Sequence, residues 1–138
     1  MSRQTWSYDE KKKLISNLNF DFSDCKAVTE KGMIKQVSNL PEIPKLQILN
    51  LSFGTSSKSK MVTDTGMNVL TNNIKKMGCI SYLSLNFTNQ KSISKVGITI
   101  LAGAIGTLKS LRTLELEFTG CQDETVPVIT ALVKNLNK

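Results

Sequence analysis

The chain has no histidine, few cysteines and no long apolar run, and each of these gaps argues against a class of protein. Without histidine, the commonest general base and metal ligand is missing, and no Ser-His or Cys-His catalytic arrangement can be formed. The three cysteines, Cys25, Cys79 and Cys121, lie far apart and outside any Cys-x-x-Cys spacing, which disfavours a disulfide framework and a zinc site. No stretch approaches the roughly 18 consecutive apolar residues that a membrane-spanning helix needs.

The first residues also lack the apolar core of a secretory signal, and three lysines, Lys11 to Lys13, follow them directly. We therefore expect an intracellular, cytoplasmic protein that does not contact a membrane. At 138 residues the chain has the size of one ordinary domain. Its net charge of +7 raises the question of a polyanionic partner, because a basic surface attracts polyanions without sequence recognition.

One short pattern occurs four times: an aliphatic residue, two variable residues, Leu, one variable, Leu or Phe, one variable, and Phe. The last three anchors of each copy alternate with polar residues, which is typical of a strand with one buried face. The copies begin 31, 34 and 31 residues apart, at Ile15, Leu46, Ile80 and Leu111.

A helix is predicted after each strand. Thr29, Thr63 and Ser94 stand where a hydroxyl can cap the first amides of a helix, and Glu124 occupies the matching place in the last unit. Apolar residues then recur three and four positions apart, which gives each helix one face to bury. These residues are Met33, Val37 and Leu40; Met67, Leu70, Ile74 and Met77; Ile98, Leu101, Ile105 and Leu108; and Val128, Leu132 and Leu136.

Strand-plus-helix units of this kind bury their apolar edges only by stacking on neighbours. The sequence therefore predicts an α/β fold in which four parallel strand-plus-helix repeats form a short curved solenoid, or horseshoe, over residues 14–138. The expected repeats are about 15–45, 46–79, 80–110 and 111–138. Residues 1–13, which include Trp6 and Tyr8, are expected to form an N-terminal cap or arm.

Residues 14–138 resemble the ribonuclease-inhibitor-like class of leucine-rich-repeat proteins. The resemblance rests on the Leu-x-x-Leu-x-Leu strand motif and on the helix segment from Val62 to Leu70. The family usually places Asn or Cys just after the strand, to hydrogen-bond neighbouring loops. Because those places here hold Ser23, Gly54, Thr88 and Thr119, the loop ladder must be built differently.

The strand side chains that alternate with the buried anchors are expected to form a concave sheet face that binds a partner. This face holds three carboxylates and no lysine or arginine, although the chain has 18 basic residues and 11 acidic ones. Its three rows are Asn17, Ile48, Tyr82 and Thr113; Asn19, Asn50, Ser84 and Glu115; and Asp21, Ser52, Asn86 and Glu117.

The positive charge falls on helices and loops, where lysine most often serves solubility and less often contacts a polyanion. The candidates for a polyanion contact are Lys58, Lys60, Lys75 and Lys76.

Catalysis is not expected. Glu115 and Glu117 share one strand face, but acid–base work needs a raised pKa or a metal and a pocket, which an open sheet does not supply. Cys25 and Cys121 lie three residues beyond Phe22 and Phe118, a shared phase that predicts buried packing and no reactive thiol. We expect no cofactor, no metal and no small-molecule substrate.

The leading hypothesis is a non-enzymatic protein–protein interaction module, a small subunit or adaptor of a larger assembly. It would bind other proteins through the concave face and through the C-terminal end, which has no polar capping unit after the fourth helix. A nucleic-acid-associated protein that uses helix and loop lysines is the first alternative. An enzyme inhibitor or regulator is the second, and it follows only from the family resemblance.

Overall fold

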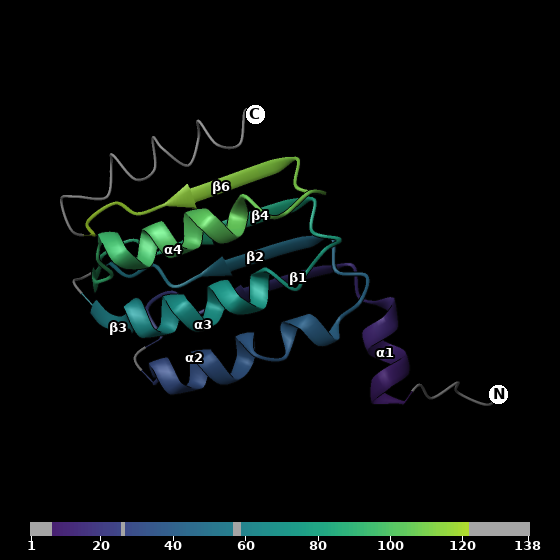
Figure 1. The fold of residues 1–138 in the computed structure, drawn as a ribbon. Coiled ribbons are helices and arrows are strands. Elements are labelled where there is room, and N and C mark those ends of the chain that lie inside the picture. The colour runs from purple at the N-terminus through teal and green to yellow at the C-terminus, as the bar shows by residue number, and fades with distance from the viewer. Residues whose placement is uncertain (1–6, 26, 57–58, 122–138) are drawn as a thin grey trace.

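Strands and helices alternate along the chain, and the strands lie parallel. The computed structural model describes residues 7–25, 27–56 and 59–121. The main sheet has the strand order β1-β2-β4-β6 (Figure 1). Its strands are β1 (Asn17–Asp21), β2 (Ile48–Ser52), β4 (Tyr82–Asn86) and β6 (Thr113–Glu117).

Three helices lie side by side over one face of this sheet: α2 (Glu30–Val37), α3 (Asp64–Ile74) and α4 (Lys95–Ile105) (Figure 1). The prediction of an α/β fold with parallel strands is confirmed. The apolar run that was expected to extend α2 to Leu40 is divided, because Leu40 is buried in a separate 3-10 helix, η1 (Leu40–Glu42), which has Pro41 in its first turn. The helix predicted over 128–136 lies outside the described residues.

The strands pair in the register that the sequence pattern predicts. Asn17 is opposite Ile48, which is opposite Tyr82, which is opposite Thr113, and the pairing continues in step to the ends of the strands. Because side chains alternate between the two faces of a sheet, this register aligns the apolar anchors on the helix side.

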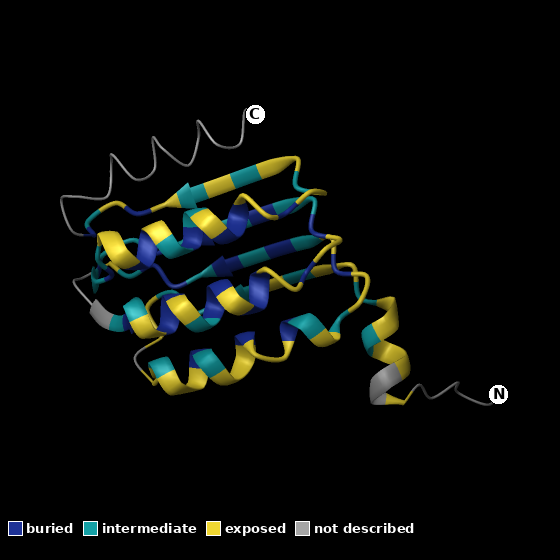
Figure 2. Ribbon diagram, in the orientation of Figure 1, coloured by how far each residue is buried: buried dark blue, intermediate teal, exposed yellow. Residues whose placement is uncertain are grey.

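The core lies between the sheet and the helices, and it is tightest in the middle of the stack. Leu49 and Leu83 are fully buried, whereas the matching Leu18 and Leu114 in the outer strands are only half-buried (Figure 2). The phenylalanines that end the four strand motifs stack on one another, with ring centroids 5.3, 5.4 and 5.4 Å apart along Phe22, Phe53, Phe87 and Phe118. Each unit therefore buries its apolar surface against its neighbours.

The predicted hydroxyl caps are confirmed. The side chain of Thr29 accepts a hydrogen bond from the amide of Gly32, that of Thr63 from Thr65, and that of Ser94 from Val96. These contacts satisfy amides that a helix start leaves without intrahelical partners.

The sequence analysis missed a second set of contacts, which links each helix start to the next. Glu30, the first residue of α2, accepts hydrogen bonds from the amide and the hydroxyl of Thr63, at 2.5 and 2.9 Å. Asp64, the first residue of α3, accepts the same pair from Ser94, at 2.8 and 2.5 Å. We call this repeated contact the cap ladder.

Two glycines make room for the cap ladder. A Cβ added to Gly66 would lie 2.7 Å from Oε2 of Glu30, and a Cβ added to Gly97 would overlap Oδ1 of Asp64. The glycines three residues after the caps Thr63 and Ser94 are thus explained by the close approach of a carboxylate from the preceding helix.

Three elements were not predicted. Helix α1 (Tyr8–Leu14) begins with a capping box, in which Ser7 and Glu10 each accept a hydrogen bond from the other's amide. The short strands β3 (Ser59–Thr63) and β5 (Gln90–Ser92) form a second parallel sheet in segments expected to be loops.

The fully buried Gln90 connects these segments. Its amide nitrogen donates to the carbonyl of Phe53 at 2.7 Å, and its carbonyl oxygen accepts from the amide of Val62 at 3.0 Å. Both ends of this buried side chain are therefore satisfied.

The prediction that Cys25 and Cys121 are both buried is wrong for Cys25, which is exposed. Cys121 is buried, and its thiol donates to the carbonyl of Phe87 in the preceding unit, 3.1 Å away. Burial raises the pKa of the Cys121 thiol. Cys25 belongs to the first strand unit, where no earlier unit in the described chain offers such a carbonyl.

Thr71 provides a first test of the core. It is fully buried in α3, and its hydroxyl oxygen has no hydrogen-bond partner within the described residues. Thr71→Val keeps the shape and removes the unpaired hydroxyl, so we expect the free energy of unfolding to rise by about 1–2 kcal/mol in urea denaturation. In the control Thr99→Val, a hydroxyl that donates to the carbonyl of Lys95 is lost from an exposed site, and no gain is expected. Destabilisation by Thr71→Val would contradict this account.

Candidate functional site

The strands present one set of side chains away from the helices, and we call this surface the open sheet face. Among the described residues, no helix covers it (Figure 1). Its side chains are exposed on β1 and β6 and half-buried on β2 and β4. The register brings together all the residues predicted for the concave face: Asn17, Asn19, Asp21, Ile48, Asn50, Ser52, Tyr82, Ser84, Asn86, Thr113, Glu115 and Glu117.

The row at the carboxyl ends of the strands also has a structural role. Asn86 accepts a hydrogen bond from the amide of Thr88 at 2.9 Å, and the same contact, also 2.9 Å, joins Asp21 to Ser23 and Glu117 to Thr119. Each side chain thereby closes the turn that follows its strand. The sequence signal was an acid or amide two residues before Ser or Thr.

Other hydrogen bonds replace those that Asn or Cys makes just after the strand in leucine-rich-repeat proteins. Neighbouring loops are joined by backbone hydrogen bonds, and the turns after β1, β4 and β6 are closed by the side chain that ends each strand. The loop bonds run from the amides of Asp24, Thr55 and Asn89 to the carbonyls of Gly54, Thr88 and Thr119, at 3.3, 3.1 and 2.8 Å.

Two of the turn-closing groups are carboxylates with lowered pKa values. Hydrogen bonds from the hydroxyl and amide of Ser23 lower the pKa of Asp21, and those from Thr119 lower the pKa of Glu117. A carboxylate with a lowered pKa stabilises the folded state above its unfolded pKa. That contribution is lost as the pH falls through the lower, folded pKa, so these turns weaken in acid.

Tyr82 and Glu115 form the aromatic and acidic centre of the face. A hydrogen bond to Glu115 raises the pKa of the Tyr82 hydroxyl, with desolvation and the charge of Glu115 as smaller causes. Tyr82 lies on β4 and Glu115 on β6, so the pair spans two neighbouring strands of the sheet.

Beside this pair, the face is hollowed between β4 and β6. The hollow has a volume of about 280 Å³ and is lined by Ser84, Asn86, Glu115 and Glu117, with Leu85 and Leu116. It presents two carboxylates, a hydroxyl and an amide. This arrangement suits a cation or a hydrogen-bond donor better than an anion.

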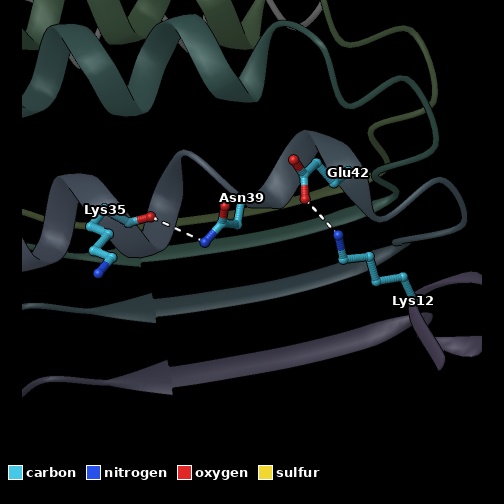
Figure 3. A network of polar contacts seen from close by, with 4 residues as sticks. All are labelled: Lys12, Lys35, Asn39 and Glu42. Atoms are coloured by element: carbon cyan, nitrogen blue, oxygen red, sulfur yellow. Dashed lines mark hydrogen bonds and ion pairs between the residues drawn. The ribbon is translucent and has the colours of Figure 1, made fainter. Parts of the chain in front are cut away.

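The ion pair found among the described residues lies elsewhere, between Lys12 of α1 and Glu42 of η1, with 2.6 Å between Nζ and Oε2 (Figure 3). Nearby, the side-chain amide of Asn39 donates to the carbonyl of Lys35 at the end of α2, 3.3 Å away (Figure 3). The ion pair joins α1 to η1 of the first unit. A second hollow, of about 460 Å³, is lined by Lys12, Lys13, Glu42 and Pro44, and it carries both signs of charge.

The residues proposed for a polyanion contact are only partly described. Lys75 and Lys76 are exposed at the end of α3. Lys60 belongs to β3, and its side chain is not described, while Lys58 lies outside the described residues. The C-terminal end and Trp6 lie outside the described residues, and the side chain of Tyr8 is not described.

Within the described ranges, no three acidic or cysteine side chains gather into a group that could hold a metal ion. In the same ranges, every helix is too short or too polar to cross a membrane. Comparisons with protein-family models, with curated proteins and with solved structures found no match to this chain.

Proposed function

We propose that this chain is a leucine-rich-repeat solenoid and a non-enzymatic protein–protein interaction module, a small subunit or adaptor that binds through its open sheet face. The observation that carries the proposal is the face itself. Four strands in register hold an ordered array of polar side chains and Tyr82, and no described helix covers them. Rigid strands that present aromatic and polar groups are well suited to recognise another protein.

Three repeated features support the solenoid assignment. The strand motif recurs in register, the motif phenylalanines stack from unit to unit, and the cap ladder joins α2 to α3 and α3 to α4. Each feature connects a unit only to its direct neighbours. Contacts of this kind define repeat proteins, which offer extended surfaces for partners.

The chemistry of the face supports binding over catalysis. Glu115 is hydrogen-bonded to Tyr82. Glu117 accepts hydrogen bonds from Thr119 in the turn after β6, and these hydrogen bonds lower the pKa of the Glu117 carboxyl. A general acid at neutral pH needs the opposite, a raised pKa.

Site-specific photo-crosslinking tests the proposal. A photo-crosslinking amino acid in place of Asn50 lies at the middle of the open sheet face, and the same residue in place of the exposed Asn68 lies on α3. In particles isolated gently from the source cells, we expect protein adducts, heavier than the 15.3 kDa chain, from position 50 and far fewer from position 68. Equal yields, or adducts from position 68 alone, would contradict the assignment of the face.

A further inference from the structure

The open sheet face and the rest of the molecule carry opposite charges. The face holds Asp21, Glu115 and Glu117 with no lysine or arginine, in a chain whose net charge is +7. The ion pair between Lys12 and Glu42 lies away from this face, between α1 and η1. Glu115 and Glu117 are exposed on β6, so a ligand on the open sheet face meets their negative potential.

Both carboxylates line the hollow between β4 and β6. Oε1 of Glu117 accepts hydrogen bonds from the amide and the hydroxyl of Thr119, and Glu115 lies beside Tyr82 of the neighbouring strand. The two residues occupy alternate positions of one strand, so their backbones lie roughly 6.6 Å apart. Ser84 and Asn86 add polar groups to the same hollow.

The size of the face also limits the ligand. Five residues a strand and four strands give an area of roughly 16 by 14 Å, and one extended segment of about five residues would span its longer side. In an extended segment, side chains two residues apart repeat at the same spacing as Glu115 and Glu117. The lining of the hollow offers hydrogen-bond acceptors to an ammonium or a guanidinium group.

We propose, on the basis of the function proposed above, that the partner docks on this face as an extended, positively charged protein segment. Two basic side chains, two residues apart, pair with Glu115 and Glu117 in the hollow between β4 and β6. The same carboxylates repel the phosphates of a nucleic acid, which would bind elsewhere on the molecule if it bound at all.

The test uses a model ligand of defined charge, the peptide Gly-Arg-Ser-Arg-Ser-Gly, and an analogue with citrulline in place of arginine. Binding is followed by NMR through the backbone amide shifts of β4 and β6. We expect the arginine peptide to shift these amides, with a response that weakens as salt is added, and the citrulline peptide to leave them unchanged. Equal binding of the two peptides, or shifts confined to other surfaces, would overturn the proposal.

Paired variants separate local recognition from general attraction. Glu115→Gln with Glu117→Gln keeps the acceptors for Tyr82 and Thr119 and removes two negative charges, and Glu10→Gln with Glu42→Gln removes two charges away from the face. We expect the first pair to weaken peptide binding by about tenfold and the second to change it less than twofold. Similar losses in both pairs would overturn the proposal, and a thermal melt confirms that each variant is folded.

The same variants distinguish a failure of this inference from a failure of the proposed function. With the photo-crosslinker in place of Asn50, we expect the adducts of the natural chain to be lost in the Glu115→Gln, Glu117→Gln variant. Adducts that persist there would overturn the charged-segment inference and leave the interaction face standing. An absence of adducts from the natural chain would overturn both.

Discussion

Gly97→Ala is expected to lower the free energy of unfolding by about 3 kcal/mol, measured by chemical denaturation and circular dichroism. The added Cβ would overlap Oδ1 of Asp64, the carboxylate that accepts hydrogen bonds from the amide and hydroxyl of Ser94. To relieve the overlap, Asp64 must move away from its donors or α4 must shift from α3. The cost therefore combines steric strain with the loss of charge-assisted hydrogen bonds.

Gly103→Ala is the matched control in the same helix. A Cβ there meets no atom within 4 Å, so the substitution should gain up to about 1 kcal/mol from helix propensity alone. In an Asp64→Ala background, Gly97→Ala should cost much less than in the natural chain, because the overlapping oxygen is gone. Equal effects of Gly97→Ala in the two backgrounds would show that the carboxylate is not the cause.

Phe87→Ala is expected to cost about 3–5 kcal/mol, the largest effect of any single truncation proposed for this chain. Phe87 is fully buried, and its ring stacks between Phe53 and Phe118 at 5.4 Å on either side. The truncation leaves a cavity and removes the ring contacts of the third strand unit with the second and the fourth. Denaturation followed by circular dichroism should show a lower midpoint.

Phe22→Ala provides the comparison for Phe87→Ala. Phe22 is chemically the same residue at the outer end of the same column, where it is only half-buried. We expect a distinctly smaller loss of stability, because the half-buried ring of Phe22 keeps less apolar surface away from water than the ring of Phe87. A loss as large as that of Phe87→Ala would mean that position in the stack does not control the contribution of each ring.

The strands, their register and the helix caps could be predicted because each depends on a pattern within about eight residues that the chain repeats. Leu49 and Leu83 stand at the same place of the same motif, so a copy-to-copy alignment already fixes which residues pair. Thr29, Thr63 and Ser94 cap their own helices, and the contact partner is two or three residues away.

The features that were missed depend on partners one unit away. The residues around Glu30 do not indicate that its carboxylate accepts hydrogen bonds from Thr63, 33 residues later. Gln90 stands in a polar segment typical of a loop, and its buried hydrogen bonds to Phe53 and Val62 depend on the fold. The roles of Asp21 and Glu117 in turns were hidden for a different reason. The same side chains also qualified as surface groups of the sheet, and the sequence does not separate the two uses.

The cap ladder also bears on whether the molecule can grow. Glu30 and Asp64 are the first residues of their helices, and Lys95 holds that place in α4. A second copy added end to end would bring the amide and hydroxyl of its Thr29 against an ammonium group, which is itself only a donor. Unlike α2 and α3, α4 therefore offers no acceptor at its first residue through which the cap ladder could continue to another α2.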